Sequence, residues 1–167
     1  DCGCGGGANI KTLLKLCPNG KVQGIDYSAV SVEKARKVNA RAIAAGRCTV
    51  QQASVAELPF KAEQFDVVTA FETVYFWPEL AQNFREVYRV LKPGGIFFIC
   101  NEANGETTKD DEWTQIIDGM TIYTDADLKV YLEQAGFGRA QSHKNKKGWL
   151  CVTAQKRTSP VWITRQI

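Results

Sequence analysis

The first nine residues, Asp1-Cys2-Gly3-Cys4-Gly5-Gly6-Gly7-Ala8-Asn9, form a glycine-rich segment that leads directly into a helical pattern. Glycines at alternate positions allow the backbone to turn sharply and to approach a ligand closely, because no Cβ atom is in the way. The free amide groups at the start of the following helix attract a carboxylate or a phosphate. The segment therefore indicates a binding site for a nucleotide-like cofactor.

An acidic residue further along the chain supports this interpretation. The short apolar run Val22-Gln23-Gly24-Ile25 ends in Asp26, which is followed by Tyr27 and Ser28. A carboxylate at the end of such a strand can accept hydrogen bonds from both hydroxyls of a ribose. The spacing Gly3-x-Gly5-x-x-Ala8 taken alone also fits an NAD-binding fingerprint, so these residues leave the identity of the cofactor open.

Composition places the chain among ordinary globular proteins. It has 167 residues, 44% hydrophobic and 23% charged, which fits one domain with a real core. The net charge of +3 is too small to indicate nucleic-acid binding. The six cysteines show no C-x-x-C spacing, so they indicate neither a metal site nor a disulfide scaffold, and we expect reduced thiols in the cytoplasm. No signal peptide and no apolar stretch of about 18 residues is present, which gives no support for a membrane association.

Strand and helix patterns alternate along the chain. Helices are predicted at 8–17, 30–45, 79–91 and 125–135, and strands at 21–27, 48–52, 65–71, 96–100, 139–144 and 149–155. This alternation predicts an α/β fold with a doubly wound, mostly parallel sheet that ends in an antiparallel hairpin. We expect a single domain over residues 1–157 and a C-terminal tail over 158–167.

A glycine turn of this kind normally follows a buried strand, and no residues precede Asp1 in this sequence to form one. We therefore expect the first strand to be missing or truncated. We also expect its central position to be filled in the folded protein, either by upstream residues or by a strand from another copy.

Five segments together resemble the class I S-adenosylmethionine-dependent methyltransferases, over a span from Asp1 to about Gln155. They are Asp1-x-Gly3-Cys4-Gly5-Gly6-Gly7, Gly24-Ile25-Asp26-Tyr27-Ser28, Ala56-Glu57-Leu58-Pro59-Phe60, Phe65-Asp66-Val67-Val68 and Arg89-Val90-Leu91-Lys92-Pro93-Gly94-Gly95. Each segment alone also occurs by chance in other proteins, but all five in this order and spacing do not. The resemblance implies a Rossmann-like fold, S-adenosylmethionine as methyl donor and S-adenosylhomocysteine as product.

The resemblance also implies which residues bind the cofactor. The glycine turn would line its methionine half, Asp26 would hold the ribose, and Tyr27 would lie along the adenine. Ser54 stands where relatives often have an aspartate, so adenine recognition is expected to depend on backbone groups as well. The expected cofactor-binding residues are Asp1, Gly3, Cys4, Gly5, Asp26, Tyr27, Ser54, Val55 and Ala56.

The methyl acceptor should bind at the carboxyl ends of the strands at 65–71 and 96–100. Glu72 and Tyr75 are the expected catalytic residues, although Glu72 could equally bind only the cofactor or nearby backbone. Phe76 is expected in the core. The expected pocket residues are Trp77, Glu102, Trp113 and Tyr123.

Residues 105–124 could form a lid over the substrate, a short amphipathic helix packed on the sheet, or both. The only histidine, His143, is expected to be structural or to lie on the surface, without a catalytic role.

The sequence thus favours an S-adenosylmethionine-dependent methyltransferase that acts on a small molecule without a metal. An aligned acceptor and an activated methyl group make a catalytic triad unnecessary. Two alternatives stay open: an NAD-dependent oxidoreductase, and a truncated module that binds a cofactor or a partner without catalysis. A homodimer is also left open.

Overall fold

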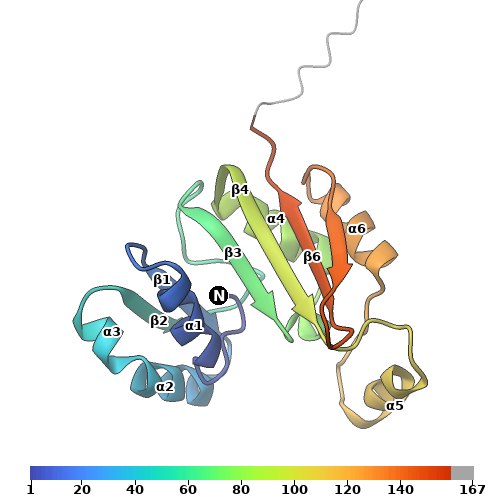
Figure 1. Ribbon diagram of the computed structural model, residues 1–167, viewed down its shortest axis with the longest axis horizontal. Coiled ribbons are helices and arrows are strands. Elements are labelled where there is room, and N and C mark those ends of the chain that lie inside the picture. Colours follow the sequence, from blue (N-terminus) through green and yellow to red (C-terminus); the bar gives the residue numbers. More distant parts are fainter. Residues whose placement is uncertain (159–167) are drawn as a thin grey trace, which may run out of the picture.

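The computed structural model describes residues 1–158, except for the side chains of Thr108, Lys109 and Asp111. The tail expected at 158–167 lies, apart from Thr158, outside the described residues. The fold is α/β with a mixed sheet, as predicted (Figure 1). Its strands are β1 (Val22–Asp26), β2 (Cys48–Gln52), β3 (Phe65–Phe71), β4 (Leu91–Asn101), β5 (Gln141–Lys144) and β6 (Leu150–Gln155). Its helices are α1 (Ala8–Leu16), α2 (Ala29–Val38), α3 (Ala40–Ala44), the 3-10 turn η1 (Val74–Phe76), α4 (Leu80–Val90), α5 (Thr108–Ile116) and α6 (Asp125–Gln134).

The strands form two hydrogen-bonded groups. β1 pairs with β2 in parallel, and the second group has the order β3-β4-β6-β5. In that group β3 and β4 are parallel, whereas β6 is antiparallel to both of its neighbours. The predicted C-terminal hairpin is therefore confirmed. β3 has the predicted bounds because its apolar run is bordered by polar residues, and the pairing register jumps across 92–95, where a turn was predicted.

Helices cover the sheet on both faces. In Figure 1, α4 and α6 lie behind β3, β4 and β6, while α1 lies in front of β1. The main core is centred on Phe84 of α4 and on Phe97 and Ile99 of β4, and a smaller core joins α1 and α2 to β1 and β2. Within the described part of the chain, no helix is long and apolar enough to cross a membrane.

β1 and β3 are not paired directly with each other. Asp1 and Cys2 lie between them: the amide of Cys2 donates to the carbonyl of Thr69 at 2.8 Å, and the amide of Ile25 donates to the carbonyl of Asp1 at 3.0 Å. Cys2 forms an isolated parallel bridge with Ile25 of β1, and the hydrogen bond from its amide to Thr69 connects it to β3, so these residues make one rung between the two strands. The rest of the space is a groove of about 470 Å³.

The helix predicted at 30–45 is two helices. α2 ends at Val38 and α3 begins at Ala40, with Asn39 between them. The side-chain amide of Asn39 is buried, and its Nδ2 donates hydrogen bonds to the backbone carbonyls of Gly7 and Ala35, both at 3.0 Å. This contact ties the glycine turn to α2, and it depends on tertiary packing that the local sequence pattern does not reveal.

Candidate functional site

Asp26 is fixed at the carboxyl end of β1 by two backbone amides. Its Oδ2 accepts a hydrogen bond from the amide of Gly5 at 2.8 Å, and its Oδ1 accepts one from the amide of Ser28 at 2.9 Å. Each carboxylate oxygen has capacity for a further donor. The glycine turn therefore orients an acceptor that can receive hydrogen bonds from two neighbouring ligand hydroxyls.

Gly5 is the position where the glycine turn faces open space. A Cβ atom built on Gly5 would have no protein atom within 4 Å, and its φ of +50° is one that side chains rarely adopt. A Cβ on Gly3 would instead lie 2.1 Å from Oγ1 of Thr73. Gly3 is thus required by packing, whereas Gly5 leaves room for a ligand to approach the backbone.

Asp1 presents an unpaired acceptor beside the same turn. Its Oδ1 accepts a hydrogen bond from Oγ1 of Thr69 at 2.8 Å, while its Oδ2 is buried and has no hydrogen-bond partner. A buried carboxylate oxygen without a donor is costly, because it has lost its hydration. Asp1, Gly5 and Asp26 together fit a ligand that has an ammonium group and a ribose, as S-adenosylmethionine has.

The remaining predicted cofactor residues fall into two groups. The first group lies at the end of β1. The amide of Ala53 donates a hydrogen bond to the carbonyl of Asp26 at 3.0 Å, which brings residues 54–56 beside this end. Tyr27 lies at the same end and is 79% exposed. Ser54 uses its hydroxyl to accept a hydrogen bond from the amide of Ala56 at 3.1 Å, which stabilises its own turn. The thiol of Cys4 instead lies in the smaller core, where burial raises its pKa to about 11. Cys4 can therefore face a cofactor only through its backbone.

A second polar cluster lies where β3 and β4 end. Glu72 has a φ of +56°, which is strained for a residue with a side chain. Its Oε1 accepts a hydrogen bond from the amide of Glu102 at 2.5 Å, and its Oε2 accepts one from the hydroxyl of Tyr75 at 3.3 Å. Glu72 is exposed as a residue, but its carboxyl is partly desolvated where it meets Tyr75 and the amide of Glu102, and this desolvation raises the pKa of the carboxyl. The structure thus brings together Glu72, Tyr75 and Glu102, as the sequence predicted.

Tyr75 is buried beneath this edge. Its side chain is only 3% exposed, and its hydroxyl oxygen accepts a hydrogen bond from the amide of Ala103 at 2.9 Å. Burial and the neighbouring Glu72 carboxylate raise the pKa of the Tyr75 phenol. Tyr75 therefore links η1 to the end of β4 and orients Glu72.

The predicted roles of Trp77 and Phe76 were wrong. Trp77 was expected in the pocket, but it is 5% exposed and stacks on Phe97 in the main core, with ring centroids 6.2 Å apart. Phe76 was expected in the core, but it is 46% exposed. The 3-10 turn η1 directs Val74 and Tyr75 inward and leaves Phe76 outside, and the chain turns Trp77 back toward β4.

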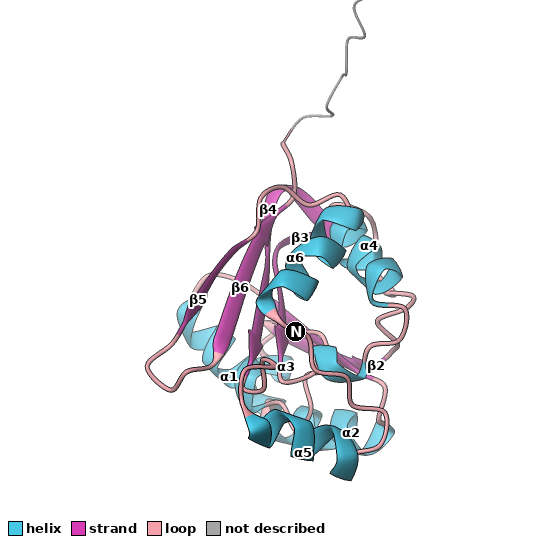
Figure 2. Cartoon of the chain, turned by 90° about the vertical axis from the view of Figure 1, so that its right-hand side faces the viewer, coloured by secondary structure: helices cyan, strands magenta, loops and turns pink. Residues whose placement is uncertain are grey.

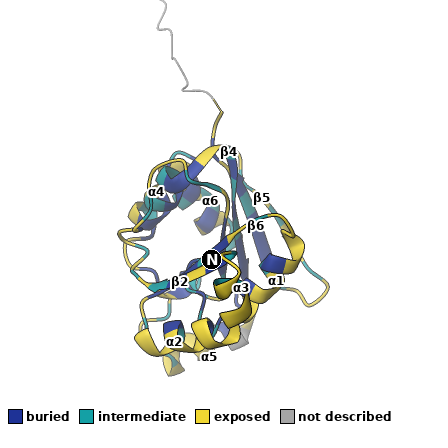
Figure 3. Ribbon diagram, turned by 90° about the vertical axis from the view of Figure 1, so that its left-hand side faces the viewer, coloured by how far each residue is buried: buried dark blue, intermediate teal, exposed yellow. Residues whose placement is uncertain are grey.

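Trp113 and Tyr123 lie in the segment that follows β4. The carboxyl ends of β3 and β4 point toward α5 in Figure 1, and the described residues of α5 are mostly exposed in Figure 3. Trp113 is 49% exposed and Ile116 is 74% exposed, so the expected packing of this helix on the sheet is not found. Tyr123 is half-buried and makes an edge contact with Tyr131 of α6. The amide of Thr121 donates to the carbonyl of Tyr75 at 2.9 Å, so this segment runs beside η1.

Asn101 is a candidate that the sequence analysis missed. It ends β4, is fully buried, and has no hydrogen-bond partner for either its Nδ2 or its Oδ1. The only signal in the sequence is a polar residue that closes an otherwise apolar strand, which is also the usual sign of a strand end.

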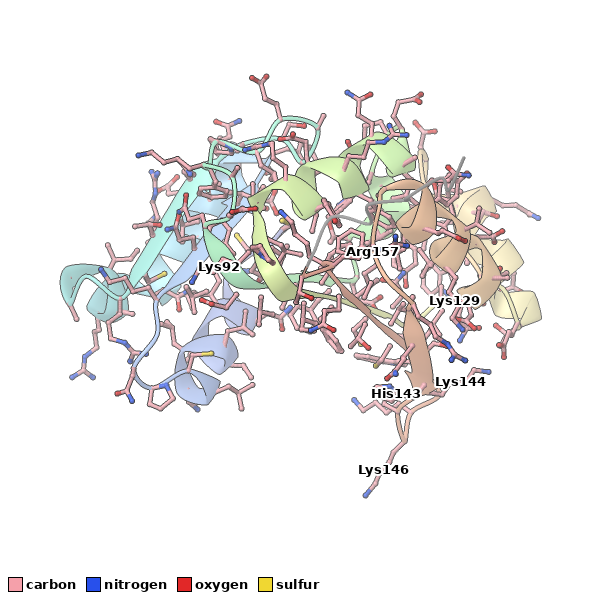
Figure 4. The ribbon with its side chains drawn as sticks, turned by 90° about the horizontal axis from the view of Figure 1, so that it is seen from above. Lys92, Lys129, His143, Lys144, Lys146 and Arg157 are labelled. Atoms are coloured by element: carbon pink, nitrogen blue, oxygen red, sulfur yellow. The ribbon has the colours of Figure 1, made fainter. Side chains whose placement is uncertain are left out.

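Among the basic side chains that the structure describes, Lys92 lies apart from those of the C-terminal hairpin. Figure 4 shows Lys92 well separated from His143, Lys144 and Lys146 of the C-terminal hairpin. Lys92 pairs with Asp66, and Lys144 pairs with Glu106. His143 lies on the edge strand β5 opposite Cys151 and is exposed, so of the two expected places, structural or surface, it has the surface one.

The sequence of this chain is similar to that of known methyltransferases. The profile of a family described as "Methyltransferase domain" matches residues 1–99. The sequence is 30% identical over 122 residues to 24-methylenesterol C-methyltransferase 2 of Arabidopsis thaliana, covering 72% of this chain and 34% of that relative. It is 35% identical over 105 residues to demethylmenaquinone methyltransferase of Symbiobacterium thermophilum, covering 62% of this chain and 41% of that relative. The chain thus spans well under half the length of these two relatives.

The fold has the same arrangement as solved methyltransferases. The crystal structure of a SAM-dependent methyltransferase from Aquifex aeolicus superposes with a TM-score of 0.79 at 22% identity, covering 93% of this chain and 80% of that one. At this identity the likeness shows a shared fold.

Proposed function

Because the chain belongs to the methyltransferase-domain family, we propose that it transfers a methyl group from S-adenosylmethionine to a small-molecule acceptor. The observation that carries the proposal is the Asp26 carboxylate, which the amides of Gly5 and Ser28 hold beside an open glycine turn. Family membership disfavours the alternative of an NAD-dependent oxidoreductase.

In this proposal the cofactor residues bind and orient. Asp26 accepts hydrogen bonds from the ribose hydroxyls, Asp1 offers its unpaired Oδ2 to the ammonium group, and the backbone at Gly5 lies against the ligand. S-adenosylmethionine supplies a methyl group that is already activated on a sulfonium. The protein then has to align the acceptor with this methyl group and to exclude water, and such positioning can lower a barrier by several kcal/mol, up to about 7–11 kcal/mol.

Glu72 is the residue we propose beside the acceptor. It lies at the end of β3, and the amide of Glu102 and the hydroxyl of Tyr75 hold its carboxyl in place. Its raised pKa makes the carboxylate a better proton acceptor than an ordinary glutamate. Glu72 would therefore accept a proton from the acceptor or pair with a cationic group on it.

The relatives support an apolar acceptor. Their names refer to a sterol and to demethylmenaquinone. In this chain Phe76, Trp113 and Ile116 are large apolar residues that are exposed near the carboxyl edge of the sheet. We also propose a cytoplasmic location, which the free state of all six cysteines supports.

Calorimetric titration with S-adenosylhomocysteine and with NAD tests the proposal directly. We expect binding of S-adenosylhomocysteine and no binding of NAD. Methyl release from S-adenosylmethionine should then be detected with at least one acceptor from a panel of phenols, amines, thiols and apolar alcohols. Binding of NAD alone would contradict the proposal. Binding of S-adenosylhomocysteine without any methyl transfer would favour the non-catalytic module.

A further inference from the structure

The side-chain amide of Asn101 is buried and has no hydrogen-bond partner within the protein. Its side chain is 0% exposed, and neither Nδ2 nor Oδ1 has a hydrogen-bond partner. Burying an amide without partners is unfavourable, because the group loses its hydrogen bonds to water and gains none in return. Most buried polar side chains are paired, so this position requires an explanation.

The strand register places Asn101 beside the proposed reaction site. Phe71 pairs with Cys100 in the parallel ladder, and the next residues along the two strands are Glu72 and Asn101. The amide of Glu72 donates to the carbonyl of Cys100 at 3.0 Å, which keeps the two chain segments together at this point. The unpaired amide and the Glu72 carboxylate therefore come from adjacent positions on neighbouring strands.

The alternation of β4 indicates which face Asn101 shares. Phe97 and Ile99 point into the main core, and Asn101 follows two residues after Ile99 on the same side of the strand. This is the face against which Trp77 stacks on Phe97. Asn101 is thus a polar position at the end of an apolar face, next to the segment that carries Glu72 and Tyr75.

We propose that Asn101 determines acceptor specificity by binding the polar group of an otherwise apolar methyl acceptor. The inference rests on the proposed function and deepens it. A carboxamide has an NH2 group that donates and an oxygen that accepts, and a single hydroxyl can pair with both because it accepts as well as donates. Phe76, Trp113 and Ile116 are large apolar side chains that are exposed, and in this proposal they contact the apolar body of the same molecule. Recognition of one polar group among apolar surfaces is a strong basis for discrimination, because an analogue that lacks the group leaves the buried amide unpaired.

Access to Asn101 requires a local opening, because its side chain has no solvent exposure. The segment after α5 is joined to this edge through the hydrogen bond from Thr121 to the carbonyl of Tyr75. The hydrogen bonds that pair β3 with β4 do not involve this segment, so a local opening there can leave the strand pairing intact.

The test compares two probes that differ only in a hydroxyl, 1-naphthol and naphthalene, with and without S-adenosylhomocysteine. We expect the wild-type chain to bind 1-naphthol at least about tenfold more tightly than naphthalene, as expected for one hydrogen bond to a buried group. In Asn101→Leu this ratio should fall to within about twofold, with the affinity for naphthalene retained. The melting temperature of Asn101→Leu should not fall, because the substitution removes an unpaired amide. Asn101→Ala provides a second variant if leucine does not fit.

Asn83→Leu is the matched control, because Asn83 is equally buried and also has an unpaired Oδ1 but lies on α4. It should leave the ratio of the two affinities unchanged. A wild-type chain that does not distinguish the probes, or an unchanged ratio in Asn101→Leu, overturns the inference. A lower melting temperature with an unchanged ratio would identify a buried water as the partner of Asn101. Titration with S-adenosylhomocysteine alone distinguishes the two failures: no cofactor binding contradicts the proposed function, whereas normal cofactor binding with an unchanged probe ratio contradicts only the inference about Asn101.

Discussion

At the scale of single residues, the glycine turn combines two requirements that the sequence does not separate. Gly3 lacks a side chain because Thr73 fills the space, whereas Gly5 lacks one because the backbone faces an opening. Asp26 then links the turn to β1 through the amide of Gly5. The structural and the ligand-binding roles of the turn are therefore assigned to different residues, and separate substitutions can test them.

Replacement of Asp26 should weaken cofactor binding. Asp26→Ala removes the acceptor for two ribose hydroxyls, and hydrogen bonds to a charged group contribute about 1.5–3 kcal/mol each. We expect the affinity for S-adenosylhomocysteine, measured by calorimetry, to fall at least about tenfold. Some stability should be lost as well, because the amides of Gly5 and Ser28 lose their acceptor. Asp66→Ala, at an exposed ion pair with Lys92, is the control and should bind normally. An unchanged affinity in Asp26→Ala would remove this residue from the site.

Gly5 permits a test with a closely matched control. In Gly5→Ala the new methyl group enters the open space beside the turn, so binding of S-adenosylhomocysteine should fall at least about tenfold. Gly46→Ala introduces the same methyl group at a φ of +69°, also with no atom within 4 Å, but in the turn after α3. Both variants should lose about 1–2 kcal/mol of stability from the left-handed backbone conformation. If Gly5→Ala binds as well as Gly46→Ala, the ligand does not approach the turn.

Glu72 should make the stability of the protein depend on pH. Partial desolvation raises the pKa of its carboxyl above the ordinary value of 4.5, so the folded state binds more protons than the unfolded state between these two values. The folded protein therefore loses stability as the pH rises through this window. The glutamine in Glu72→Gln does not titrate. The difference in melting temperature, variant minus wild type, should therefore increase as the pH is raised from about 4 to about 8. Glu33→Gln, on the exposed surface of α2, serves as the control. A difference that stays constant or decreases with pH would contradict this assignment.

At the scale of elements, the hydroxyl of Tyr75 connects η1 to the residues after β4 by a hydrogen bond from the amide of Ala103. Tyr75→Phe leaves the buried amide of Ala103 without an acceptor, which should cost about 1–3 kcal/mol of stability. It also removes a donor to Glu72, so the KM of the acceptor should rise or kcat should fall, while the affinity for S-adenosylhomocysteine stays within a few-fold. Tyr88→Phe on α4 is the control for removal of a tyrosine hydroxyl. Loss of cofactor affinity in Tyr75→Phe would instead connect η1 to the cofactor site.

The elements also show where prediction from sequence ends. β3 was predicted with its observed bounds because a short, mostly apolar run rich in valine and phenylalanine is bordered by the polar residues Gln64 and Glu72. The break at Asn39 was missed because it depends on a hydrogen bond to Gly7, a residue far away in sequence. The sides taken by Phe76 and Trp77 depend on a 3-10 turn, which has no strong pattern of its own. Asn101 was missed because burial without a partner is visible only once the strands are packed.

At the scale of the whole molecule, the groove between β1 and β3 is the feature that most affects the fold. Figure 1 shows the two strands apart, with the N-terminus between them. Its walls include apolar side chains from both groups of strands and from α1, and two of them, Leu16 and Val67, are largely exposed. In the described part of the chain, β1 pairs along its length only with β2, and β3 only with β4. The facing edges therefore have unpaired backbone groups beyond the rung that Asp1 and Cys2 form.

An extended apolar segment ahead of Asp1 should fill this groove. The amides of Cys2 and Ile25 already form parallel-ladder hydrogen bonds to Thr69 and Asp1, so they set the direction and the register of such a strand. Five added residues at about 3.3 Å each would run along the facing edges of β1 and β3. Because apolar side chains from both sides line much of the groove, the added residues should be mostly apolar, as in a buried parallel strand.

The experiment fuses a Val/Leu/Ile pentapeptide to Asp1 and compares it with a Gly/Ser pentapeptide of equal length. The apolar extension should raise the melting temperature by at least about 5 °C, because paired backbone groups and buried apolar surface replace an open groove. It should also tighten binding of S-adenosylhomocysteine, since Asp1 and the glycine turn continue directly from the new strand. Sedimentation of the chain without an extension tests the other way of filling the groove, because a strand exchanged with a second copy would give a dimer. Equal stability of the two fusions, or a structure in which β1 pairs directly with β3, would show that the groove does not accept a strand.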